Sequence, residues 1–291
     1  MKKSYPYRLT VFMGVAGLSF SSILAKLSTA PSMVVSLYRT LLAVLFLAPF
    51  AIRHRCEIKS MDGRDILFCL LGGLCFGCHF SLYCESVKYT AITSATMLID
   101  CEILFVAPVM RVFFGERFSR VGISGIFLTL TGSLIITVSG FQQGDDAVWG
   151  NLLACAGAFF LAMFTILGKV CRTRISNSSY SFFVYLGASG TLLIALFFLR
   201  TPLMGYDPIN YLIALGFTVL CTFGGHAIFS WALKYVRASF VSTAKLLEPA
   251  FASIFAFLIF DQVPSFTVIA GGLTVIAGVA VYARGGVEND K

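Results

Sequence analysis

The sequence predicts an all-α polytopic membrane protein with ten transmembrane helices in two inverted five-helix repeats. The 291 residues are 58% hydrophobic and only 12% charged, whereas a soluble domain averages roughly 25% charged residues. The apolar runs are long enough for spanning helices, each of which needs about 20 residues. They do not show the alternation of apolar and polar residues that is typical of a transmembrane barrel strand.

Charged residues or turn residues separate the apolar runs from one another. The first run is not followed by a cleavage site typical of a signal peptide, so we interpret it as a span. The predicted spans are 9–27, 32–52, 65–87, 91–114, 120–139, 148–168, 180–199, 208–233, 238–260 and 264–283.

Lys and Arg are distributed unevenly between the two sets of loops. With the N-terminus in the cytoplasm, the outer segments hold only Lys26, Lys88 and Arg200, and Arg39 and Lys245 lie within spans. The remaining Lys and Arg of the 22 fall on the inner side. Because an excess of basic residues marks cytoplasmic loops, both termini are predicted to be cytoplasmic.

The two halves of the chain resemble each other. Residues 23–26 (ILAK) return as 166–169 (ILGK), and Glu102 in the fourth span occupies the place of Glu248 in the ninth. The loop after the fifth span, GFQQGDDAV, has no basic residue and divides the halves. The predicted units are a first repeat at 1–140, an outer linker at 141–147 and a second repeat with a cytoplasmic tail at 148–291.

Five spans per half is an odd number, so the second half enters the membrane with the opposite orientation. Inverted repeats of this kind are the architecture of many secondary transporters, in which the binding site lies near the midplane where the halves meet. We therefore expect a transport pathway between the two repeats.

Several short motifs then show that the chain resembles the EamA branch of the drug/metabolite transporter superfamily. They are Leu247–Phe251 with its Glu-Pro, the helix end Phe114–Phe118, and Arg39 within Ser36–Thr40. The resemblance implies export or exchange of small metabolites, often amino acids, across a bacterial inner membrane. The first half has Ile103 where the second has Pro249, which leaves open whether both repeats bend alike.

Ionisable residues inside spans are costly and usually functional, and two of them lie in the ninth span. Lys245 and Glu248 are three residues apart and therefore share one face of a continuous helix. We expect them to bind charged groups of the substrate, together with Arg39 of the second span. The alternative is that Lys245 and Glu248 simply satisfy each other.

Two acids, Asp100 and Glu102, lie in the fourth span. They are two residues apart, about 200° around a continuous helix, and cannot point at the same spot. We expect Glu102 to face the pathway and to carry the coupling proton, with or without Asp100, because it has no cationic partner on its own helix. The alternative is a packing bridge from Asp100 or Glu102 to Arg39.

Aromatic and His residues are expected to form walls beside these charges. His79 and His226 lie at nearly matching repeat positions in the third and eighth spans, and Tyr83 and Trp231 follow about one turn later. Three deep acids against two deep bases favour a zwitterionic or cationic substrate over an anion. A packing role for either His remains open.

No enzyme motif or ATP-binding loop is present, so no catalytic residue is predicted. The run Cys75–His79 matches a haem-attachment pattern but lies within a span, and no cofactor or metal is expected. The net charge of +8 reflects the inner loops and not a nucleic-acid site. The expected partners are a small-molecule substrate, the proton and the lipid bilayer, for a monomer or homodimer.

The sequence therefore predicts an inner-membrane antiporter that exports or exchanges an amino acid-like or cationic metabolite. One alternative is an importer of an S-adenosylmethionine-like or nucleoside-like metabolite. Alternatives of another class are an intramembrane enzyme that uses Asp100 and Glu102 as an acid pair, and a sensor that transports nothing. The helical spacing of the two acids argues against the enzyme, because an acid pair must converge on one substrate.

Overall fold

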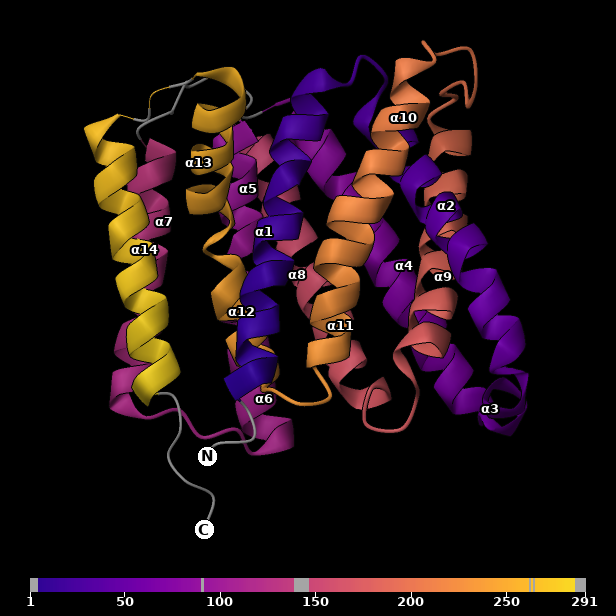
Figure 1. The fold of residues 1–291 in the computed structure, drawn as a ribbon, viewed down its shortest axis with the longest axis horizontal. Helices are drawn as coiled ribbons and strands as arrows, with labels where there is room; N and C mark the ends of the chain where they lie inside the picture. The colour runs from indigo at the N-terminus through magenta and orange to yellow at the C-terminus, as the bar shows by residue number, and fades with distance from the viewer. Residues whose placement is uncertain (1–4, 90–91, 139–146, 262, 264, 286–291) are drawn as a thin grey trace.

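The computed structural model describes residues 5–89, 92–138, 147–261, 263 and 265–285. The regular structure of these residues is helical throughout. Figure 1 shows the helices packed side by side, with the start of α1 and the end of α14 at the same end of the bundle, at the bottom of the view. Residues 141–146 of the predicted linker lie outside the described residues, and α8 begins at the next residue.

The helices follow the predicted apolar runs, with breaks and one addition. They are α1 (Tyr5–Leu27), α2 (Ser32–Arg53), α3 (Arg55–Ser60), α4 (Gly63–Ser86), α5 (Ile92–Asp100), α6 (Ile103–Phe114), α7 (Arg120–Val138), α8 (Ala147–Cys171), α9 (Asn177–Phe198), α10 (Ile209–Gly216), the π-helix η2 (Phe217–Ala227), α11 (Ile228–Ala232), α12 (Ala238–Lys245), α13 (Glu248–Phe260) and α14 (Phe266–Gly285).

Eight helical segments among the described residues are long and apolar enough to cross a membrane. They correspond to the predicted spans other than the fourth and the fifth. The fourth predicted run forms two short helices, α5 and α6, and the fifth forms α7. The chain is thus a multi-pass membrane protein, and the full count of ten spans stays a prediction.

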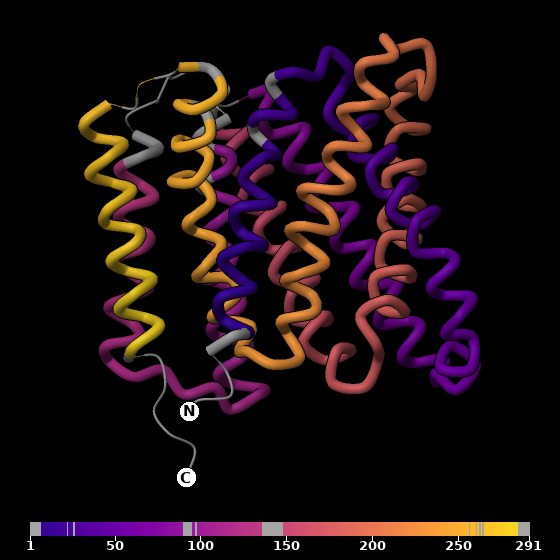
Figure 2. Tube along the Cα trace, in the orientation of Figure 1, coloured from indigo at the N-terminus to yellow at the C-terminus, as the bar shows by residue number. Residues whose placement is uncertain are grey.

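The helix contacts follow the predicted repeats. Each of the most extensive contacts has a counterpart in which the equivalent helices of the other half take their place. In the first half, α4 packs against α8 and α9 of the second. Its counterpart η2 packs against α1 and α2 of the first half. The helices α2 and α9 pack against each other, and so do α7 and α14. Figure 2 shows α7 and α14 running side by side at one edge of the bundle.

Glycines bring helices from the two halves into backbone contact. A Cβ atom on Gly278 of α14 would lie 2.4 Å from Thr129 Oγ1 of α7, and one on Gly125 would lie 2.5 Å from Tyr282 N. On α4, a Cβ atom on Gly73 would lie 2.3 Å from Val184 O of α9. Small residues allow this close approach, which van der Waals packing then rewards in a bilayer.

The eighth predicted span contains the π-helix η2, which sequence periodicity did not predict. Its wider turns place the buried Thr218, Thr222 and His226 along the helix. On its α1 side, a Cβ atom on Gly17 would lie 2.4 Å from Gly224 O, so α1 packs directly on the η2 backbone. π-helical turns are rare and often occur at functional sites.

Candidate functional site

Two helix breaks lie at the equivalent place in the two halves. The helix α5 ends at Asp100 and α6 begins at Ile103, while α12 ends at Lys245 and α13 begins at Glu248. At the second break, Pro249 supplies no amide proton and is tolerated in the first turn of the new helix. The first break occurs without a proline, so both repeats interrupt this helix despite the departure at Ile103.

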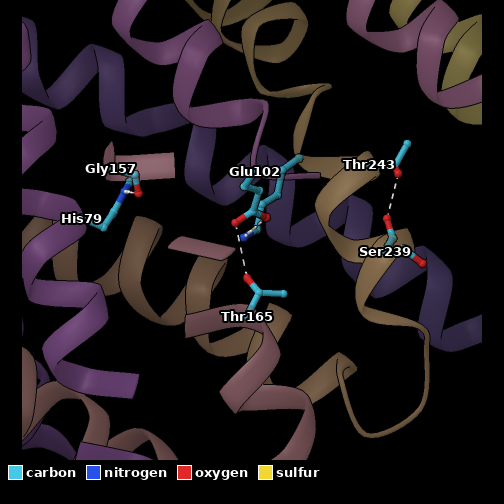
Figure 3. Close-up of polar contacts among 7 residues, drawn as sticks. His79, Glu102, Gly157, Thr165, Ser239 and Thr243 are labelled. Atoms are coloured by element: carbon cyan, nitrogen blue, oxygen red, sulfur yellow. Dashed lines mark hydrogen bonds and ion pairs between the residues drawn. The ribbon is translucent and has the colours of Figure 1, made fainter. Parts of the chain in front are cut away.

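Lys245 at the end of α12 pairs with Glu102 at the start of α6. Lys245 Nζ lies 2.8 Å from Glu102 Oε1, and the side chains are 3% and 0% exposed. Thr165 Oγ1 of α8 donates to the other carboxylate oxygen, Oε2, at 3.4 Å. Figure 3 shows Glu102 and Thr165 pointing toward each other from separate helices. This buried pair joins the two halves of the chain.

The structure corrects two expectations about these residues. Lys245 does not bond to Glu248, because the helix does not continue through 246–247 and the spacing of a continuous helix no longer applies. Glu102 was expected to carry the coupling proton because its own helix offers no cation, and the structure gives it a cationic partner from the other half. Its proposed role as the carrier of the coupling proton therefore loses its physical basis.

Of the three acids at the helix breaks, Asp100 and Glu248 have no ion pair among the described residues. Asp100 is 4% exposed, and its Oδ2 atom is buried without a hydrogen-bond partner in the described part of the chain. Glu248 Oε1 accepts a hydrogen bond from Ser21 Oγ of α1 at 3.1 Å. The Glu248 carbonyl accepts another from Ser19 Oγ, also at 3.1 Å.

The predicted separation of Asp100 from Glu102 assumed a continuous helix, which the structure does not have here. Asp100 interacts electrostatically with both Glu248 and Glu102. The angle of about 200° assumed an unbroken helix, and the break lies between Asp100 and Glu102. The three acids therefore belong to one charged cluster, and their spacing in the sequence does not separate them.

Arg39 lies in the middle of α2 and is 5% exposed. Its guanidinium carbon sits 4.2 Å from the ring centre of Phe80 and 5.5 Å from that of Phe217. Two of its nitrogens, Nε and Nη2, are buried without a hydrogen-bond partner among the described residues. The alternative packing bridge from Asp100 or Glu102 to Arg39 is absent from the ion pairs of the described residues.

The two His residues meet in an aromatic cluster that sequence reasoning missed. Phe76 lies 4.7 Å from His226 and 6.1 Å from His79, measured between ring centres, and Phe80 contacts both. His79 Nδ1 bonds to Gly157 O of α8 at 3.2 Å (Figure 3), whereas His226 Nδ1 is buried without a partner. The two mirrored residues are therefore in different bonding states.

The two aromatic residues that were predicted to form cavity walls, Tyr83 and Trp231, lie in different parts of the structure. Tyr83 is near the His79 ring, with centres 6.5 Å apart, and its hydroxyl lies 3.2 Å from Thr96 Oγ1. Trp231 instead packs on Tyr7 and Tyr235, with ring centres 5.6 Å and 5.0 Å away. The structure thus places Tyr83 beside the His cluster and Trp231 at the end of α11, away from it.

One end of the bundle also carries buried polar contacts, and one of them, Glu116–Ser239, joins the two halves. Glu116, which follows α6, is buried and accepts a hydrogen bond from Ser239 Oγ of α12. Tyr282 Oη of α14 donates to the same Ser239 oxygen at 2.9 Å. Lys169 Nζ of α8 donates to the carbonyls of Leu233 and Val236, both at 2.8 Å.

A cavity of about 620 Å³ lies at the far end of α9 and not at the charged cluster. Its lining is mainly apolar and includes Leu193, Phe197 and Leu203, with Arg200 at its edge. The charged residues between the breaks are closed off in this structure, with exposures of 0% for Glu102 and 2% for Lys245. Only Glu248 of the cluster is partly exposed.

The helical bundle is that of a multi-pass membrane protein, and charges paired at two broken helices are typical of secondary transporters. The EamA-like transporter family model matches residues 7–138 and 148–284. The chain belongs to this family. The two matched segments lie on either side of the linker region.

Several known proteins are similar to this chain. An uncharacterized transporter of Archaeoglobus fulgidus is 27% identical over 67% of this chain and 68% of its own length. Another, of Clostridium kluyveri, is 23% identical over 100% of this chain and 96% of its length. Human solute carrier family 35 member G1 is 24% identical over 88% of this chain and 73% of its length.

One solved crystal structure has the same fold. It superposes with a TM-score of 0.79 at 15% identity and covers 95% of this chain and 96% of its own. At this identity the likeness shows the fold alone. The family and these relatives indicate a transporter, which is not an enzyme.

Proposed function

We propose that the protein is a secondary active transporter that exchanges a small amino acid-like or cationic metabolite for protons by alternating access. It does so with ten spans in two inverted five-helix repeats, residues 1–140 and 148–291, in a bacterial inner membrane with both termini cytoplasmic. The exchange of helix contacts between the halves supports the repeats. The start of α1 and the end of α14 lie at the same end of the bundle, which supports termini on the same side of the membrane.

One observation carries this proposal: the buried Lys245–Glu102 pair spans the two halves at their broken helices. A buried ion pair contributes little net stability, since desolvation offsets most of the attraction. Discontinuous helices whose broken ends meet near the middle of the bundle are typical of substrate and ion sites in transporters. The pair therefore joins the two halves at the kind of helix break where transporters bind substrates and ions.

The remaining charges indicate what the site accepts. Once Lys245 and Glu102 neutralise each other, Asp100, Glu248 and Arg39 are left. Two acids against one base favour a substrate with a positive group. A buried carboxylate without a cationic partner binds a proton more readily than a paired one. We therefore assign proton coupling to Glu248 and Asp100 in place of Glu102.

The polar contacts around Glu116 close one end of the bundle, and this is the end that must open during transport. The Glu116–Ser239–Tyr282 bonds join α6, α12 and α14, and Lys169 ties α8 to the chain after α11. Asp261, which follows α13 as Glu116 follows α6, is exposed. In alternating access the first set of contacts would break while the end near Asp261 closes.

The test is transport by the purified full-length protein in proteoliposomes. Vesicles loaded with single amino acids, polyamines or nucleosides are assayed for counterflow of the labelled compound, with and without an imposed pH gradient. We expect at least one amino acid or amine to exchange and to accumulate with the gradient. Asp62→Asn, at an exposed acid before α4, is the matched control and should transport like the wild type.

Two results would contradict the proposal. One is the absence of counterflow for every compound by protein that is shown to be folded and inserted. The other is gradient-driven uptake that survives the double change Asp100→Asn and Glu248→Gln, which removes both proposed proton carriers.

A further inference from the structure

Arg39 has a feature that the proposed function does not use. Its Nε and Nη2 atoms form one edge of the guanidinium plane, and their N–H groups point in the same direction. Both atoms are buried without an acceptor among the described residues. This edge is the one that a carboxylate accepts with two parallel hydrogen bonds.

We propose that this edge of Arg39 binds the carboxylate of the transported molecule, which is then a zwitterion with a free carboxylate and an ammonium group. The inference rests on the proposed transport function and narrows its substrate class. A buried charge that lacks an acceptor is costly, so an Arg in this state is expected to meet an anion at some point in its cycle.

The protein's own acids do not fill that role in this structure. Glu102 Oε1 is bonded to Lys245, and Glu248 Oε1 to Ser21. Asp100 Oδ2 has no bonded partner, yet it does not bond to Arg39. Arg39 interacts electrostatically with Glu248, but no hydrogen bond or ion pair in the described part of the chain joins the two side chains.

The residues near Arg39 are aromatic, and the neighbouring helix η2 carries unbonded polar atoms. The rings of Phe80 and Phe217 hold the guanidinium in place by cation–π contact, at 4.2 Å and 5.5 Å. The π-helix η2 adds two further unbonded polar atoms, Thr222 Oγ1 and His226 Nδ1, both buried. Phe80 contacts His226 as well, with ring centres 6.1 Å apart.

The charges then match a zwitterion. Arg39 meets the carboxylate, and the ammonium group is left to Glu248 or Asp100, which carry the negative charge of the cluster. A simple amine would leave Arg39 unsatisfied, and a simple carboxylate would leave both acids so. A site built to hydrogen-bond a group discriminates strongly against an analogue that lacks it.

The experiment compares each free amino acid with its amide, which keeps the ammonium group but lacks the carboxylate. The full-length protein in detergent is titrated with L-leucine, L-threonine, L-phenylalanine and the three amides. The shift in melting temperature reports binding, since a ligand that binds only the folded state stabilises it. The same free amino acids are assayed for counterflow in proteoliposomes.

For the free acid that binds best, we expect an affinity about 10- to 100-fold above that of its amide, the range of hydrogen bonds to a charged group. Arg39→Gln should remove this preference by weakening the acid and not the amide. Arg39→Lys keeps the charge but not the paired N–H groups, and should give an intermediate loss. Glu248→Gln should weaken acid and amide alike, and Arg64→Gln, at an exposed arginine, should change neither.

The outcomes separate the inference from the function it rests on. Equal binding of acids and amides by the wild type overturns the carboxylate site while leaving transport intact. The same holds if Arg39→Gln binds neither or weakens both equally. If no free amino acid binds or exchanges, the inference is wrong; if polyamines also fail in counterflow, the proposed function is wrong too, whether or not a nucleoside exchanges.

Discussion

The breaks in the fourth and ninth spans occupy equivalent places, yet their acids are in different states. Glu102 is fully buried and bonded to Lys245 and Thr165. Glu248 is partly exposed and bonded to Ser21. The same contrast recurs at the helix ends, where Glu116 is buried and Asp261 is exposed. The two repeats share one sequence pattern, yet Glu102 holds the halves together while Glu248 is free to change partners.

The largest expected effect is on the acid that joins the halves. Glu102→Gln leaves Lys245 buried without its counter-charge, which typically costs about 3–5 kcal/mol. We expect a large drop in the melting temperature of the purified protein. The double change Glu102→Leu and Lys245→Met should recover much of that loss, because an apolar pair of similar volume avoids desolvation. If Glu102→Gln alone were as stable as the wild type, the holding role would be wrong.

The equivalent change in the ninth span should act on transport and not on folding. Glu248→Gln keeps a side chain that can bond to Ser21, so the free energy of unfolding should change by less than about 1 kcal/mol. The proton-driven component of uptake should fall about tenfold or more, because the amide cannot carry a proton. Uptake driven by a pH gradient is compared with counterflow at equal pH. A large loss of stability with intact coupling would reverse the comparison.

The helix ends give a smaller effect in the same direction. Glu116→Gln replaces a buried charged acceptor and should cost about 1 kcal/mol, since hydrogen bonds to charged groups exceed neutral ones by roughly that much. Asp261→Asn, at an exposed position with φ of 53°, should stay within about 0.5 kcal/mol. Thermal unfolding of the two variants side by side measures the difference. Equal losses would mean that burial of Glu116 carries no weight.

The smallest effect is expected at Pro249. The first half breaks its helix without a proline, so Pro249→Ala should leave the second break in place. A proline in the first turn removes an amide that has no helical partner there, and its loss should change stability by less than about 1 kcal/mol. Hydrogen exchange of the amides at 246–250 tests this. Strong new protection across these residues would show that the proline alone causes the break.

Much of the architecture could be predicted from the sequence because hydrophobicity and charge are properties of local runs. The apolar runs predicted the helix positions closely. The ionisable residues inside the spans identified the charged cluster. The π-helix was not predicted, because its extra residue per turn leaves no clear mark in an all-apolar run; the glycines at 224 and 225 were the available signal.

The pairing within the cluster could not be predicted. Spacing along a continuous helix allowed Lys245 to pair with Glu248 and separated Asp100 from Glu102, and neither spacing applies across the helix breaks. Phe76 and Phe80 were missed for a different reason. Among 29 phenylalanines, nothing in the sequence marks the ones that face Arg39 and His226.

By itself the sequence determined that this chain is a multi-pass helical membrane protein of the EamA-like family with charges buried inside it. Apolar run length and charge content decide this, and neither depends on how the helices cross. Only the tertiary structure decided which charge meets which: Lys245 reaches Glu102 because the broken ends of two helices from opposite halves meet, and Arg39 keeps an edge without an acceptor among the described residues. Such contacts join residues more than a hundred positions apart, where no local pattern can specify a partner.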